Sequence, residues 1–268
     1  MHRADPGLTI GGRLGGGDLR RARELVLHLA AREIAARHRF TLLGWAWPLA
    51  RQLAQLGVLY VVFTSIVDLG IESYAAFLFT GIVAWGWFAA AVSEGADAVV
   101  AQRHLVFRPQ CPAAVLPVVP VVVALVDALI ALPVLLVLVA AGGELHASAL
   151  FLPVIAAVQL VLSCGIAWLA AATSVYLRDV RQLVGVGLLL LFYLTPVFYD
   201  LSRIPDDYEW ALRLNPLTTI LEAYRAVLIE QRLPDAVPLL IVTAASAAVA
   251  AAGLLVFQRL RGGFVDEL

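Results

Sequence analysis

Lysine is absent from this sequence of 268 residues, and all 19 of its basic residues are arginines. The phosphate-binding loop of many nucleotide hydrolases needs the lysine of GxxxxGK[ST] to reach the nucleotide phosphates. The chain therefore carries no ATPase of that kind, and an ATP-driven step would require another subunit. Chemistry through a lysine Schiff base is excluded for the same reason.

Cysteine is scarce as well, with Cys111 beside a proline and Cys164 inside an apolar run. Two isolated thiols predict neither a disulfide framework nor a metal site. The first forty residues are rich in glycine and arginine and lack the pattern of a signal peptide. We therefore expect no N-terminal segment to be removed.

Charged residues are few, at 15% of the chain, whereas 62% of the residues are hydrophobic. A soluble domain of this size would need more polar surface, so the composition predicts an integral membrane protein. A membrane-spanning helix needs about 20 apolar residues. The predicted fold is all-α, with six transmembrane helices at residues 42–67, 74–94, 113–140, 147–176, 182–199 and 236–257.

Arginine is distributed unevenly between the segments that connect these helices. One side holds only Arg203, Arg213, Arg225 and Arg232, whereas most other arginines fall on the side that holds both termini. Cytoplasmic segments of membrane proteins carry an excess of basic residues. We therefore predict a multi-pass protein of the cell inner membrane with both termini in the cytoplasm.

The N-terminal region is predicted to hold a flexible lead, residues 1–17, and then an amphipathic helix capped by Asp18. Basic and acidic residues share one face of that helix, and apolar residues share the other. This pattern is typical of a helix in the inner membrane interface. Two roles remain open, a lipid anchor or an additional contact with a cytoplasmic partner. The apolar positions are Leu19, Ala22, Val26, Leu29 and Ala30.

The outer segment 200–234 is half apolar and broken by prolines. We expect Asp206 or Asp207 to cap a short helix that ends before Asn215, and Pro216 to begin a second helix. About fifteen residues give a second helix of roughly 22 Å, too short for a ~30 Å hydrocarbon core. Irregular backbone at membrane depth persists only inside protein or beside a water-filled cavity. We predict an outer re-entrant hairpin beside a pathway; a lid on the outer leaflet is the alternative.

An ordered set of short motifs runs through these segments. From Arg178-Asp179 the chain continues with Thr195-Pro196, Tyr199, Ile204-Pro205, Asn215-Pro216 and Arg225, and Leu43-Gly44, Trp47 and Pro48 open the first predicted span. This set resembles the membrane subunits of type-2 ABC transporters that export polysaccharides such as O-antigen, capsule, teichoic acid or galactan. The resemblance covers residues 20–260. It departs at Arg108, where the family usually has lysine, and at Cys111, where it usually has an aromatic residue.

The resemblance implies a homodimer of permease subunits around a central conduit, driven by two copies of a separate ABC ATPase. Such a permease would move a lipid-linked polysaccharide from the cytoplasm across the inner membrane. ATP and Mg²⁺ would bind to the ATPase, so we expect no cofactor, no metal and no catalytic residue on this chain. We expect contact with membrane lipids but not with nucleic acid. Residues 18–260 would form the transmembrane domain and residues 261–268 a cytoplasmic tail.

Three groups of residues are predicted to act in transport. A coupling segment, residues 97–112, mixes charge with apolar anchors as docking into a partner's groove requires: Gln102, Arg103, His104, Leu105, Val106, Phe107 and Arg108. Aromatic rings that could stack on sugar rings in the conduit are Tyr60, Trp85, Trp87, Phe88, Tyr193, Phe198 and Tyr199. The outer gate comprises Pro196, Pro205, Asn215, Pro216 and Arg225. Aromatic and basic residues also gather at membrane interfaces without any role in transport.

Two charges fall inside predicted spans, Arg51 in the first and Asp127 in the third. A charge at the bilayer centre costs about 2.5–3.5 kcal/mol on insertion scales, so each should face a partner or water. The sequence leaves open whether the two pair with each other or whether Arg51 meets the membrane surface or the substrate. Ala244, Ala248 and Ala252 form a stripe of small residues in the last span, which predicts close packing within the subunit.

Other functions remain open at this point. A type-2 ABC permease for a drug or a small lipid would have the same architecture. A membrane-embedded glycosyl- or phosphotransferase could place a metal on Asp206-Asp207, but no histidine lies nearby and no DxD pattern occurs. A channel is disfavoured, because the sequence contains no ring of charges or carbonyl filter motif.

Overall fold

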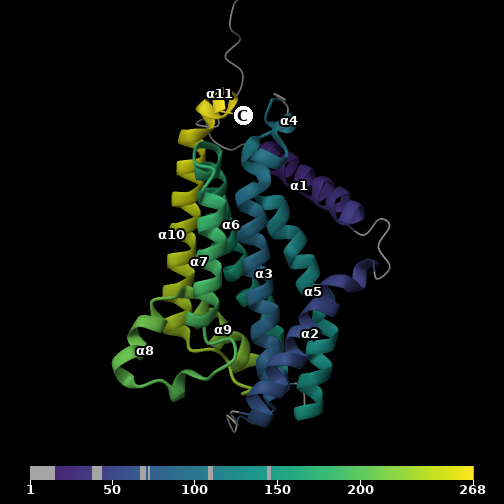
Figure 1. Ribbon diagram of the computed structural model, residues 1–268, viewed down its shortest axis with the longest axis vertical. Coiled ribbons are helices and arrows are strands. Elements are labelled where there is room, and N and C mark those ends of the chain that lie inside the picture. The colour runs from purple at the N-terminus through teal and green to yellow at the C-terminus, as the bar shows by residue number, and fades with distance from the viewer. Residues whose placement is uncertain are drawn as a thin grey trace, which may run out of the picture.

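Four long apolar helices run along the length of the molecule in the computed structural model (Figure 1). They are α3 (Tyr74–Ala101), α5 (Val118–Gly142), α6 (Leu152–Tyr176) and α10 (Ala236–Leu260). With their flanking helical turns, all four are long and apolar enough to cross a membrane. The structure describes residues 16–37, 44–66, 71, 73–107, 111–143 and 146–267, and this part of the chain contains no strand.

The central helix of the bundle is α3, which packs against α5, α6 and three shorter helices. The shorter helices are α2 (Trp47–Val61), α7 (Val180–Leu194) and α9 (Pro216–Leu228). Buried residues occur all around α3, from Phe77 and Phe79 to Trp87 and Phe88. A helix that is apolar all round belongs in the interior, and α3 has that position here.

The helices α2 and α7 are shorter than the spans predicted at 42–67 and 182–199. Each has 15 residues, and α2 continues into a π-helical turn, η2 (Val62–Ile66). Pro48 lies in the first turn of α2, where its missing N–H costs no hydrogen bond. Thr195 ends α7 in an extended conformation, as expected of a residue before proline. The count of six membrane-crossing helices therefore remains a prediction.

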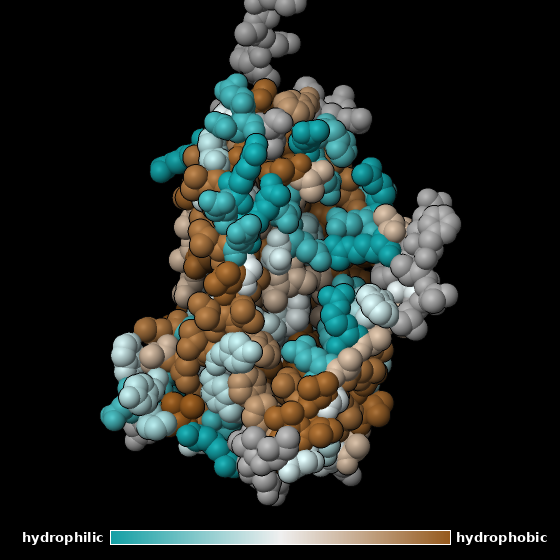
Figure 2. Space-filling view, viewed as in Figure 1, coloured by the Kyte–Doolittle hydropathy of each residue, from teal (hydrophilic) through white to brown (hydrophobic). Residues whose placement is uncertain are grey.

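Two ends of the bundle differ in their secondary structure (Figure 1). One, here called the α1 end, carries α1 (Gly16–Arg37), α4 (Arg103–Val106) and α11 (Phe264–Glu267). The opposite α8 end carries η5 (Leu201–Arg203), α8 (Asp206–Arg213) and α9. Figure 2 shows hydrophilic residues gathered over the α1 end and hydrophobic residues along the side of the bundle below it.

Helix α1 begins at Gly16, so Asp18 lies within the helix and does not cap it as predicted. Its apolar face packs on the start of α5 and on the helical turn before it, where Ala30 and Ile34 meet Val115, Val119 and Val123. The predicted amphipathic helix is therefore attached to the bundle along one face. Most of the predicted flexible lead, together with Leu43 and Arg108, lies outside the described residues.

The α8 end contains two short helices that meet at Asn215-Pro216, close to the predicted arrangement. The Asn215 side chain caps α9 by accepting a hydrogen bond from the Leu217 N–H at 3.0 Å. The cap prediction for α8 is wrong, because Pro205 holds the N-cap position and Asp206 and Asp207 are already helical. Helix α9 has 13 residues, slightly fewer than the roughly fifteen expected, and ends at Leu228.

Close approach between α6 and α10 depends on glycine. A Cβ on Gly165 would lie 2.7 Å from the backbone of Ala250, and one on Gly253 would collide with the Gly165 carbonyl. The prediction that the alanine stripe of α10 packs closely within the subunit is wrong, since Ala244, Ala248 and Ala252 are exposed. The buried face of α10 instead carries Val242, Ser246, Gly253 and Phe257.

Candidate functional site

The segment after α7, residues 195–200, is called the hinge below. Thr195 is buried, and its hydroxyl donates to the Leu191 carbonyl at 2.7 Å and accepts from the Asn215 side-chain amide at 2.9 Å. The Asn215 side chain therefore makes two contacts: its amide nitrogen donates to Thr195, and its Oδ1 caps α9. This pair of contacts joins the end of α7 to the beginning of α9.

Arg225 of α9 is the most deeply buried charge near the hinge, with 4% of its surface exposed. Its guanidinium carbon lies 3.4 Å from the centroid of the Phe77 ring, and a terminal nitrogen donates to the Val197 carbonyl at 2.8 Å. The Tyr74 hydroxyl donates to the next carbonyl, that of Phe198, at 2.9 Å. Two hinge carbonyls that no helix satisfies are thus bonded by side chains of α3 and α9.

Burial lowers the pKa of Arg225 to about 9, although the charges of Asp200 and Glu222 oppose the decrease. The guanidinium is therefore still a cation at neutral pH. A buried cation is stabilised by a facing aromatic ring and by carbonyl oxygens, and Phe77 and Val197 supply both.

A glycine of α3 allows the hinge to lie against that helix. A Cβ on Gly81 would lie 2.6 Å from the Val197 carbonyl oxygen, closer than side chains approach such an atom. Val197 itself is fully buried. The position of the hinge thus depends on the absence of a side chain at residue 81.

Aromatic rings form a continuous cluster around the hinge. The Phe63 and Phe198 rings stack at 5.1 Å between centroids, and Phe192 of α7 lies 5.6 Å from Trp85 of α3. Six of the predicted conduit residues meet in this aromatic cluster: Tyr60, Trp85, Phe88, Tyr193, Phe198 and Tyr199. Tyr193 and Tyr60 are 59% and 41% exposed, so the cluster reaches the surface. The sequence interpretation missed Phe63, Tyr74, Phe77 and Phe192 as members.

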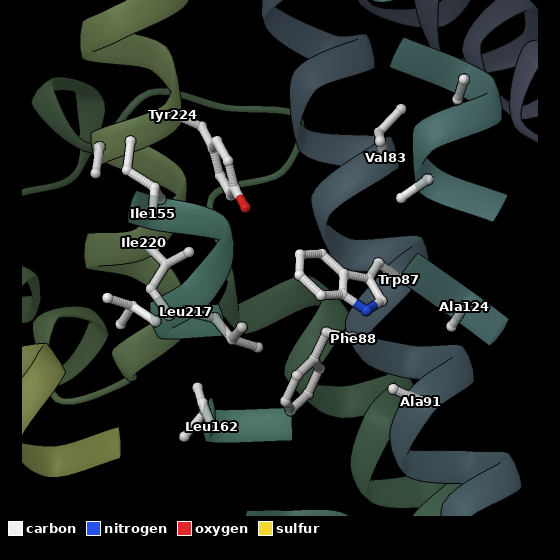
Figure 3. Packing of buried hydrophobic residues seen from close by; sticks show 14 of the residues in the cluster. Val83, Trp87, Phe88, Ala91, Ala124, Ile155, Leu162, Leu217, Ile220 and Tyr224 are labelled. Atoms are coloured by element: carbon white, nitrogen blue, oxygen red, sulfur yellow. The ribbon is translucent and has the colours of Figure 1, made fainter. Parts of the chain in front are cut away.

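Trp87 does not join that cluster, and Phe88 joins it only through Trp85, at 5.9 Å between ring centroids. They are 4% and 2% exposed, and Figure 3 shows their rings among side chains of α6 and α9 such as Leu162 and Ile220. The Trp87 indole donates to the Val121 carbonyl at 3.3 Å and lines an apolar cavity of about 400 Å³. Both rings pack in the core of the subunit, and their role in a conduit stays a prediction.

The coupling segment combines one buried residue with several exposed ones. Leu105 of α4 packs against Ala98 and Leu116. Arg103 and His104 are exposed, and Phe107 is 51% exposed. Gln102 and Val106 are half-buried. The segment is thus anchored at one residue while charged and aromatic side chains remain on the surface.

Ion pairs at the α1 end tie neighbouring helices to α3. Arg37 of α1 contacts Glu33 at 2.8 Å and also pairs with Glu94 of α3. Arg181 of α7 lies 2.8 Å from Asp97 of α3. Burial opposes the charged form of Arg37, but hydrogen bonds and charges from Glu94 and Glu33 outweigh it and raise the pKa. Sequence reasoning counted Arg37 and Arg181 as basic residues but did not find their partners.

The two charges predicted inside the membrane occupy different environments. Arg51 is exposed on α2, and Asp127 is half-buried on α5. Pro196 is buried in the hinge, and Pro205 is exposed before α8. Pro216 is half-buried and begins α9.

The bundle of long apolar helices is that of a membrane protein. Between its last two long helices, α6 and α10, lies a hinge that is held in place by side chains. Residues 24–229 match the ABC-2 type transporter family. The chain therefore belongs to this family of membrane transport proteins. An O-antigen export system permease protein, RfbA of Myxococcus xanthus, is 33% identical over 254 residues, covering 94% of this chain and 98% of that protein.

More distant relatives have similar names. An O-antigen export system permease protein of Klebsiella pneumoniae is 25% identical over 248 residues, covering 91% of this chain and 95% of the relative. The polysialic acid transport protein KpsM of Escherichia coli is 26% identical over 222 residues, covering 79% of this chain and 83% of the relative.

Proposed function

We propose that this chain is the permease subunit of an ATP-driven exporter that moves a lipid-linked cell-envelope polysaccharide across the inner membrane. The observation that carries the proposal is the similarity to an O-antigen export permease along nearly the whole length of both chains. Membership of the ABC-2 type transporter family supports a separate ATPase subunit. The absence of lysine supports it too, since a phosphate-binding loop requires one.

In the proposed arrangement the α1 end faces the cytoplasm and the α8 end faces outward, with six spans in each subunit. The excess of arginine in segments at the α1 end supports this orientation. The exposed residues Arg103, His104 and Phe107 would contact the ATPase, and α1 would transmit its movement through Arg37 and Glu94. Two copies of the chain would enclose the conduit.

The exposed part of the aromatic cluster supports a conduit for sugars. Tyr60 and Tyr193 present rings at the surface, and Tyr199 follows in the hinge. A sugar polymer has apolar ring faces that stack on aromatic side chains, while few fixed charges are present there to hold it. The hinge would act as the outer gate, since residues of α3 and α9 fix its position.

The experiment that tests this function combines the permease with its ATPase in a strain whose own permease gene is deleted. We expect the wild-type chain to restore surface polysaccharide, and Tyr193→Ala to reduce it while the complex still assembles. Val137→Ala, on an exposed part of α5, is the matched control. Complexes that assemble and hydrolyse ATP without restoring polymer, but export a drug or small lipid, would support the alternative permease function.

A test of the coupling segment uses the purified complex. Arg103→Glu together with His104→Glu should weaken co-purification of the ATPase or reduce its stimulated turnover. Arg203→Glu, at the α8 end, should leave both unchanged. Normal assembly and turnover in the double variant would remove the coupling role from this segment.

A further inference from the structure

A polar cavity of about 220 Å³ lies at the α8 end, between η5, α9 and the beginning of α10. Arg225 forms its buried part, whereas Arg232 and Asp235 lie near the surface, with 51% and 75% of their side chains exposed. The cavity adjoins the hinge, because Asp200, the last hinge residue, lines it. Its polar lining includes Asp200, Thr219, Glu222, Arg225, Glu230 and Arg232.

A buried hydrogen-bond donor of Arg225 is unsatisfied. A terminal nitrogen bonds the Val197 carbonyl, but the buried Nε has no hydrogen-bond partner. Across the described residues, no carboxylate forms an ion pair with Arg225; Asp200 and Glu222 act on it from a greater distance. A buried donor is normally satisfied by protein, water or ligand. Arg225 lines the cavity, so an acceptor placed there would lie against its guanidinium group.

Each arginine at the rim is contacted by two carboxylates. Arg213 contacts Glu209 at 2.6 Å and Glu222 at 3.4 Å. Arg232 contacts Glu230 at 2.6 Å and Asp235 at 3.4 Å. Carboxylates thus outnumber guanidinium groups at the rim, and they would repel an anion.

The remaining groups match hydroxyls. The Arg225 guanidinium donates, the oxygens of Asp200 and Glu222 accept, and the Thr219 hydroxyl does both. A hydroxyl group also donates and accepts, so a ring with several hydroxyls could satisfy all four side chains at once. Burial raises the pKa of the Glu222 carboxyl, although Arg213 and Arg225 oppose the rise. Such a carboxyl accepts from a hydroxyl when ionised and donates to one when protonated.

We propose that this cavity binds one neutral hexopyranose unit of the exported polymer, a site distinct from the aromatic cluster. The identity of the ligand as part of the exported polymer rests on the proposed function. Arg225 would contact the sugar through its guanidinium group while one terminal nitrogen holds Val197. A sugar in the cavity would therefore touch the residue that fixes the hinge, and this contact would link occupancy to the position of the gate.

The test uses the full-length chain in lipid nanodiscs without an ATPase, with methyl α-D-glucopyranoside and methyl α-D-mannopyranoside as probes. Saturation-transfer NMR should show saturable binding of at least one glycoside. Thr219→Val keeps the side-chain shape, and it and Glu222→Leu should each weaken binding about tenfold. Arg203→Gln, on η5 and outside the cavity, should bind like the wild-type chain.

Two results would overturn the proposal. One is the absence of saturable binding, or equal binding by wild type, Thr219→Val and Glu222→Leu. The other is stronger competition by inorganic phosphate than by unlabelled glycoside, which would identify an anion site. The proposed function is tested separately: a chain that restores surface polymer without binding glycosides rejects this site alone. A chain that binds glycosides but exports no polymer rejects the function alone.

Discussion

At the scale of single residues, the hinge depends on side chains that lie far from it in the sequence. Arg225 and Tyr74 donate to the two carbonyls that follow Pro196, and Gly81 leaves room for one of them. Of the three, only Arg225 lies within the proline-broken segment 200–234, whereas Tyr74 and Gly81 lie far from it in the sequence. Proline accounts for the break in the helix, but hydrogen bonds from α3 and α9 account for where the chain goes next.

Replacing Arg225 by methionine should loosen the hinge without emptying the space beside Phe77. Methionine keeps an apolar contact with the ring but leaves the Val197 carbonyl without its donor. A hydrogen bond to a charged group contributes about 1.5–3 kcal/mol, so amides of residues 195–200 should exchange roughly 10- to 100-fold faster. Hydrogen–deuterium exchange of the purified chain measures this. Arg203→Met should change nothing, and unchanged hinge exchange in Arg225→Met would contradict the assignment.

Gly81 and Gly57 offer a matched pair of substitutions within helices. Gly81→Ala should destabilise the protein by about 1–3 kcal/mol, because its Cβ would collide with the Val197 carbonyl. Gly57→Ala should be neutral or stabilising by about 0.5–1 kcal/mol, since no atom lies within 4 Å of the added Cβ. Unfolding in detergent by increasing fractions of sodium dodecyl sulfate measures both. Equal effects would show that the close contact does not constrain the hinge.

At the scale of elements, α1 is both an amphipathic helix and a packed part of the bundle. Ala30 and Ile34 bury one face against α5, and Arg37 reaches Glu94 of α3. The helical spacing of charged and apolar residues predicts the amphipathic character. It gives no partner for Glu33 and Arg37, because a partner on α3 is a matter of tertiary contact.

Exchanging the charges of Arg37 on α1 and Glu94 on α3 should test whether this ion pair holds the two helices together. Arg37→Glu and Glu94→Arg should each lower stability, since like charges would then face each other. The double variant should recover about 0.5–1 kcal/mol, the range for a partly exposed pair. The measurement is a double-mutant cycle of detergent unfolding together with proteolysis within α1. A double variant that is no more stable than the sum of the single effects would show that packing on α5 alone holds α1.

The sequence predicts most elements of this fold and fewer of its contacts. Apolar length predicts the four long helices, and Asn215-Pro216 predicts the start of α9. The stripe of alanines in α10 misled the interpretation, because small residues occur on both faces and only the packing of Gly165 against Gly253 selects one. Aromatic residues behave alike in sequence, so burial was needed to separate Trp87 from Tyr193.

At the scale of the whole molecule, exposed apolar side chains concentrate on the shorter helices. Among the described residues of α7 none is buried, and Val186, Leu190 and Tyr193 are more than half exposed. Helix α2 is similar, with Val58 and Val61 exposed. Both helices flank the exposed rings of the aromatic cluster. A second copy of the chain that covers these faces would place two sets of rings around a shared passage.

Cysteine cross-linking in membranes should detect that arrangement. In a chain with Cys111 and Cys164 replaced by alanine, Val186→Cys on α7 should form a disulfide-linked dimer upon mild oxidation. Val137→Cys, 68% exposed on α5, is the control and should remain monomeric on non-reducing gels. The physical reason is distance: two cysteines bridge only when their Cα atoms come within about 7 Å, which residues at an interface around a two-fold axis can reach. Cross-linking at Val137 but not along α7 would place the second copy on α5 and remove the aromatic cluster from the conduit.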